Sequence, residues 1–136
     1  MLFRSNPQIK IYPAFDGREM HGRLKLVKML AEGDYDNVLI IHDLLTLVQP
    51  IDMKGASICT AISKLKELKD TKYHLYFPID VPFKYSDMGW LQEIKTFDTL
   101  IPYTEFAKSQ MRVAGIVETS EPMYHGVDTK IGRAHV

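Results

Sequence analysis

Side chains able to bind ligands or move protons follow each of the four short apolar segments that we expect to form strands. They are His42 and Asp43 after the first segment, Asp80 after the second, Tyr103, Thr104 and Glu105 after the third, and His125 and Asp128 after the fourth. In an open parallel sheet the carboxyl ends of the strands meet at one edge, where ligands collect and helix N-termini point their amide groups. The sequence therefore predicts a functional site at this edge.

The elements that must position these side chains alternate along the chain between strand and helix patterns. The expected strands are Val38–Ile41, Tyr73–Phe77, Thr99–Ile101 and Pro122–Tyr124, and the expected helices are Arg18–Glu32, Ala56–Lys69, Ser86–Lys95 and Thr104–Ala114. The strand segments are mostly apolar on both faces, which is typical of strands covered on both sides in a parallel sheet. Their alternation with helices predicts right-handed crossovers and a doubly wound, Rossmann-like parallel α/β sheet.

The adjacent pair His42 and Asp43 has two interpretations. The imidazole can act as a general base with the carboxylate orienting it, because imidazole exchanges protons near neutral pH. Alternatively, Asp43 caps a helix that begins at Leu44, and His42 makes a hydrogen bond with the backbone.

Asp80 and Thr104 also each have a functional and a structural interpretation. In a crevice, the Asp80 carboxylate can accept a hydrogen bond from a hydroxyl group of a ligand or take a proton from an alcohol. As a turn residue, it bonds instead to amides of its own loop. Thr104 opens a helix directly after a strand, where free amides can bind phosphate, or it simply caps that helix.

Four motifs occur in a fixed order along the chain. They are His42-Asp43 directly after a strand, Phe77-Pro-Ile-Asp80, Tyr103-Thr-Glu-Phe106 and His125-Gly-Val-Asp128. In their order and spacing, the stretch from Ile9 to Thr129 resembles the N-terminal domain of the GT-B glycosyltransferases, which move sugars from nucleotide donors to acceptors. The resemblance implies that the intact parent is a hexosyltransferase that acts on a nucleotide-sugar donor and an acceptor hydroxyl, with retention of stereochemistry and without a metal or another cofactor.

The resemblance also assigns roles to the candidate residues. It implies acceptor-side catalytic roles for Asp43 and Asp80, with His42 beside them, and places Tyr103, Thr104 and Glu105 near the diphosphate of the donor. It makes His125, Gly126 and Asp128 part of the hinge to a second domain, with Gly126 allowing a positive φ or a close approach of another segment. Two features depart from the family: Val81 replaces a glycine after Asp80, and the glycine-rich loop near the donor phosphates is missing or reduced.

The donor-binding C-terminal domain of that family has no counterpart in this chain. We therefore expect residues 1–130 to be a truncated N-terminal, acceptor-side domain that is inactive alone. Ile131–Val136 resembles one reading frame of a sequencing adapter, so we exclude this tail from the site. Two alternatives remain open: a small doubly wound binding or signalling module that is complete as it stands, and a non-catalytic interaction domain.

Composition narrows the class of protein. The 136 residues include 17 basic and 17 acidic side chains, so no charge excess favours a nucleic-acid partner. The single cysteine, Cys59, is expected to be a buried core thiol, and the five histidines show no metal-ligand spacing. No signal-peptide pattern and no apolar run long enough to span a membrane occur, so we expect a cytoplasmic protein without a membrane span.

Overall fold

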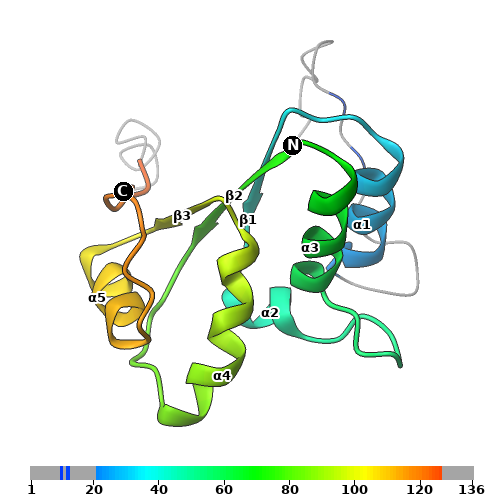
Figure 1. Ribbon diagram of the computed structural model, residues 1–136. Helices are drawn as coiled ribbons and strands as arrows, with labels where there is room; N and C mark the ends of the chain where they lie inside the picture. The colour runs from blue at the N-terminus through cyan, green and yellow to red at the C-terminus, as the bar shows by residue number, and fades with distance from the viewer. Residues whose placement is uncertain (1–9, 11, 13–20, 127–136) are drawn as a thin grey trace, which may run out of the picture.

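The computed structural model describes residues 10, 12 and 21–126, which form a mixed α/β unit around a three-stranded parallel sheet (Figure 1). The sheet order is β1-β2-β3, with both neighbouring pairs parallel. The elements are α1 (Arg23–Glu32), β1 (Asn37–Ile41), α2 (Leu44–Val48), α3 (Ile58–Leu68), β2 (Lys72–Phe77), η1 (Tyr85–Asp87), α4 (Met88–Leu91), η2 (Gln92–Thr96), β3 (Thr99–Pro102) and α5 (Glu105–Val113). Three of the four expected strands are confirmed, and the expected helix over Ser86–Lys95 is present as the consecutive pieces η1, α4 and η2.

The core lies on one face of the sheet. Ile40, Leu75 and Leu100 are aligned by the register across the three strands, and all three are buried. Helix α1 packs against α3, and α3 packs against η2, so these segments form one layer over that face. The side chain of Gln92, at the start of η2, donates a 3.2 Å hydrogen bond to the carbonyl of Ala114, which joins the end of α5 to this layer.

The opposite face of the sheet is more open among the described residues. Leu39 is 57% exposed and Ile41 is 56% exposed, whereas β2 and β3 place half-buried His74, Tyr76 and Ile101 on this side. The expectation that each strand is covered on both faces is therefore wrong for β1. Its apolar run has the composition of a central strand, but the helices of the described chain that pack on β1 leave Leu39 and Ile41 in solvent.

The N-terminus of α3 is held by a capping box. Ser57 Oγ accepts a 3.2 Å hydrogen bond from the amide of Thr60, and Thr60 Oγ1 accepts a 2.7 Å bond from the amide of Ser57. These two bonds satisfy amides that a helix leaves without partners at its start. Ser57 itself is buried, so no water can replace the lost hydroxyl easily.

We expect Ser57→Ala to lower the free energy of unfolding by about 1 kcal/mol, because the amide of Thr60 loses its acceptor. Urea denaturation followed by circular dichroism measures this as a lower midpoint with an unchanged slope. Ser63→Ala, on the exposed side of the same helix, is the control and should shift the midpoint much less. Equal shifts for the two variants would show that the capping box is not stabilising.

Helix α1 ends at Glu32, as its sequence pattern predicts, but it begins later. The expected start at Arg18 lies outside the described residues, and Gly22 has φ 69°, so the helix begins at Arg23. At its other end, Lys69 Nζ donates to the carbonyls of Ala31 at 2.8 Å and Gly33 at 2.6 Å. A lysine that follows α3 thus donates hydrogen bonds to carbonyls at the C-terminus of α1, which joins the two helices.

The expected fourth strand, Pro122–Tyr124, is wrong. Ser120 donates to the carbonyl of Leu100 and Met123 to that of Pro102, so the segment does run beside β3. The acceptors are two residues apart, as in a ladder, but the donors are three apart. Pro122 has no amide hydrogen to donate at the intervening position, which breaks the regular pairing.

Candidate functional site

The parallel sheet brings the carboxyl ends of β1, β2 and β3 to one edge. His42 and Asp43 follow β1, Asp80 lies three residues beyond β2, and Tyr103 and Thr104 follow β3. The candidate residues that the sequence places after three strands therefore lie along one border of the sheet. We refer to this border as the carboxyl edge.

A pocket of about 340 Å³ brings Asp43 and Asp80 together at the carboxyl edge. Neither carboxylate has a hydrogen-bond partner among the described residues. Asp43 occupies the N-cap position of α2, but its side chain accepts no hydrogen bond from the helix amides. Asp43 therefore marks the start of α2 without capping it through its carboxylate. Both carboxylates are free to accept hydrogen bonds from a ligand in this pocket.

Phe83, Asp87 and Trp90 also line this pocket, and the sequence did not single them out as site residues. Asp87 is held in place, because Oδ2 accepts the amide of Lys84 at 2.7 Å and Oδ1 accepts Trp90 Nε1 at 3.3 Å. The Phe83 and Trp90 rings meet edge to face at 6.4 Å. The half-buried aromatics could not be recognised from periodicity, because the fold brings them there through an irregular loop and a short helix.

The His42 ring is hydrogen-bonded to the backbone of Asp43 and not to its carboxylate. Its Nδ1 accepts a 2.8 Å hydrogen bond from the amide of Asp43, which leaves the proton of a neutral ring on Nε2. The ring lies 6.0 Å from that of His21 and lines a separate pocket that includes Leu26 and Ile40. The alternative of a backbone hydrogen bond is therefore the one that the geometry shows for His42.

A cluster of aromatic rings covers the carboxyl ends of β2 and β3. The Tyr103 ring lies 4.1 Å from that of Tyr76 and 4.2 Å from that of His125, and Tyr76 donates its hydroxyl to the carbonyl of Met123 at 2.5 Å. Burial, followed by the neighbouring Tyr76 and Asp43, raises the pKa of Tyr103. The ring cluster and Asp43 therefore lie at the same edge of the sheet.

Thr104 and Glu105 begin α5 at the same edge. Thr104 Oγ1 accepts a 3.1 Å hydrogen bond from the amide of Ala107, so Thr104 acts as the N-cap. Glu105 lies in the first turn, where its charge stabilises the helix dipole. The same charge opposes an anion at this helix end, so these two residues make a poor phosphate site without a cation beside them.

The residues expected in a hinge are only partly described. His125 packs on the aromatic cluster, whereas Asp128 lies outside the described residues. Gly126 is not among the glycines with positive φ, and a side chain placed there would meet open space. In this structure, then, neither reason for requiring glycine at this position applies.

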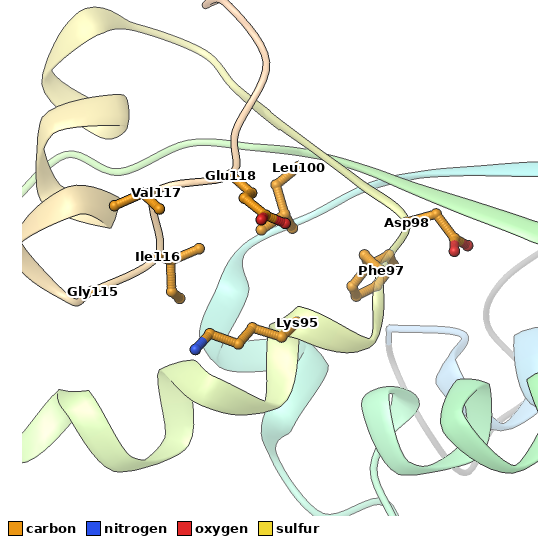
Figure 2. A pocket seen from close by; sticks show the side chains of 8 residues that line it. All are labelled: Lys95, Phe97, Asp98, Leu100, Gly115, Ile116, Val117 and Glu118. Carbon is orange, nitrogen blue, oxygen red and sulfur yellow. The ribbon is translucent and has the colours of Figure 1, made fainter.

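A second pocket of about 320 Å³ lies at the opposite end of β3 (Figure 2). Lys95, Phe97 and Asp98 line it on one side and Gly115–Glu118 on the other. The Asp98 carboxylate points away from the Lys95 and Glu118 side chains in Figure 2. It accepts Lys66 Nζ and the amide of Tyr73 instead, both at 2.8 Å. Polar groups do not converge in this pocket, so the carboxyl edge remains the candidate site.

The expectation that Cys59 is a core thiol is confirmed, because its side chain is buried. Burial, with a smaller contribution from Glu93, raises the pKa of this thiol to about 12, so it is not a nucleophile at neutral pH. In the part of the chain that the structure describes, no group of three acidic, histidine or cysteine side chains is arranged to bind a metal. Nor does any helix there have the length and apolar character needed to cross a membrane.

The chain was also compared with known proteins. The comparisons with family models, with curated proteins and with solved structures found no match to this chain.

Proposed function

We propose that this chain is the N-terminal, acceptor-side half of a two-domain glycosyltransferase whose complete sheet is doubly wound. The observation that carries the proposal is the pocket in which Asp43 and Asp80, from loops after two different strands, lie together. The order of motifs that resembles the GT-B family supports it. The intact parent transfers a sugar from a nucleotide donor to an acceptor hydroxyl, in the cytoplasm.

The chemistry of the pocket suits a polyhydroxylated ring. Two carboxylates without internal partners can accept hydrogen bonds from sugar hydroxyls, and one of them can take the proton of the attacking hydroxyl. Phe83 and Trp90 supply apolar surface for the C–H face of a pyranose, as in small-molecule sites that combine aromatic walls with few polar groups.

The donor is held mainly by a second domain in this proposal. Closure of two domains over both substrates excludes water from the reacting centre and so prevents hydrolysis of the donor. Tyr103 and Thr104, with Glu105, form the border that faces the donor, and the segment from His125 through Asp128 leads into the second domain. No lysine or arginine lines the pocket at the carboxyl edge, so the described residues offer no cation there for a diphosphate.

The chain contains a single tryptophan, so the Trp90 indole gives one side-chain N–H signal in a two-dimensional NMR spectrum. Titration of the protein with a panel of hexoses and disaccharides is expected to shift this signal and to leave UDP-, GDP- and ADP-sugars unconverted. Asp43→Asn and Asp80→Asn should each weaken sugar binding at least about tenfold, because a charged hydrogen-bond acceptor is lost.

Asp70→Asn is the matched control, because Asp70 is fully exposed at the other end of β2. A panel that leaves the indole signal unmoved, or an Asp70 variant that weakens binding as strongly, contradicts the acceptor site. Turnover of a nucleotide sugar by this chain alone contradicts the assignment as one half of an enzyme.

One observation favours the alternative of a non-catalytic interaction domain. Leu45 and Val81 border the pocket and are 51% and 68% exposed, which leaves apolar surface at the carboxyl edge. Such surface suits either a lost domain or a protein partner. Sugar binding at Trp90 supports a surface covered by a lost domain of a glycosyltransferase. The absence of sugar binding favours a surface that binds a protein partner.

A further inference from the structure

No segment of the described residues pairs with the outer edge of strand β1, which we call its free edge. The amide of His42 donates to Tyr76 and the amide of Lys72 donates to the carbonyl of Asp36, so even-numbered residues of this segment bond to β2. Because bonding direction alternates along a parallel strand, the backbone groups of Asn37, Leu39 and Ile41 point away from the sheet. No hydrogen bond reaches those groups from the described residues.

Strand β1 itself carries none of the local features that normally prevent an edge strand from pairing. Native edges are blunted by charged side chains, by proline or by a bulge. The strand Asn-Val-Leu-Ile-Ile carries no charge and no proline, and Leu39 and Ile41 are more than half exposed. An apolar pocket of about 230 Å³, lined by Leu26, Met29 and Val38 among others, opens beside this strand.

We propose that a second copy of this chain pairs with the free edge, antiparallel, about a two-fold axis at Leu39. In this register Leu39 faces its own counterpart and Asn37 faces Ile41. These are the residues whose N–H and C=O groups point outward on both copies. Each such pair exchanges two hydrogen bonds, so the contact forms roughly six bonds and one continuous six-stranded sheet.

A polar pair at each end of the contact favours this register. The same axis places Asp36 of one copy opposite His42 of the other. The His42 ring, whose Nδ1 accepts the amide of Asp43, carries its proton on Nε2 and can donate it to a carboxylate, and like charges do not face each other across the paired strands. On the open face, the two Leu39 side chains pack together and remove exposed apolar area from water. The interface is isologous, so it closes at a dimer.

The oligomeric state of the full 136-residue chain tests this proposal by sedimentation velocity over a wide concentration range. The wild-type protein is expected to convert from monomer to dimer as concentration rises. Leu39→Lys places two like charges at the axis and is expected to weaken the dimer at least about tenfold. Leu68→Lys is the matched control, because Leu68 is 80% exposed on α3 and off the edge. It should leave dimerisation unchanged.

Amide hydrogen exchange supplies a second readout that needs no variant. The amides of Asn37, Leu39 and Ile41 are expected to be protected in concentrated samples and to exchange quickly in dilute ones. A protein that stays monomeric throughout overturns the proposal. So do edge amides that are equally protected at all concentrations, because a segment of the same chain then covers the edge. Equal weakening by the Leu39 and Leu68 variants overturns it as well.

Discussion

Leu75→Ala is expected to lower the free energy of unfolding by about 2–5 kcal/mol, the largest effect among the substitutions considered for this protein. Leu75 is fully buried at the centre of β2, between Ile40 and Leu100 of the neighbouring strands. The substitution removes apolar contacts and leaves a cavity, because strands held by hydrogen bonds on both sides cannot close around it. Thermal and urea denaturation measure the loss as a lower midpoint.

Leu68→Ala provides the control for this experiment. It removes the same atoms from a side chain that is 80% exposed at the end of α3. Little area is lost from the core there, so the change in unfolding free energy should stay within about 0.5 kcal/mol. Similar losses for both variants would mean that Leu75 is not in a packed core.

Asp98→Ala is expected to cost about 1–3 kcal/mol of stability at neutral pH. The Asp98 carboxylate accepts Lys66 Nζ from α3 and the amide of Tyr73 from β2, and the Asp98 amide donates back to Tyr73. Its removal leaves the amide of buried Tyr73 without this acceptor and leaves Lys66 with the carbonyl of Thr96 as its hydrogen-bond partner. The side chain is partly exposed, so the expected loss comes mainly from hydrogen bonds and less from the screened ion pair.

The effect of Asp98 on stability should depend on pH. Partial burial alone raises the pKa of Asp98, but the bonds from Lys66 and Tyr73 and the charges of Lys66 and Lys72 outweigh burial and leave the pKa below its usual value. A carboxyl with a lowered pKa in the folded state stabilises above its unfolded pKa of about 3.9. That contribution disappears as pH falls through the folded value.

Denaturation curves from about pH 7 down to pH 2 are therefore expected to show the wild-type and Asp98→Ala proteins converging in acid. Glu121→Ala serves as the comparison. The hydrogen bond from Lys108 also lowers the pKa of Glu121, but this carboxyl is fully exposed, so its loss should not change stability measurably. A gap between wild-type and Asp98→Ala that is constant with pH would rule out the ionised carboxylate as its source.

The sequence predicted the positions of the strands better than their burial. Apolar, β-branched runs place β1, β2 and β3 within a residue of their observed bounds, because such runs favour extended backbone wherever they lie. The same runs also predict that both faces of each strand are buried. For β1 this failed, because the exposure of Leu39 and Ile41 depends on which helices pack nearby, and no local pattern records that.

The candidate site was predictable in part. That Asp43, Asp80 and Thr104 lie at one edge follows from parallel strands, and the parallel direction follows from helical connections. The direction of each side chain could not be predicted from the sequence. His42 turns into a different pocket from its neighbour Asp43, whereas Asp87 and Trp90 enter the candidate pocket from a segment with no site signal.

The sequence by itself determined the ends of several helices, because caps such as Ser57 and Thr104 and stops such as Gly115 act through bonds and torsions within a few residues. Only the tertiary structure decided which side chains share a pocket and which edge of the sheet is left unpaired among the described residues. These properties depend on contacts between residues far apart in the chain, and the free energy of such contacts is set by packing and burial.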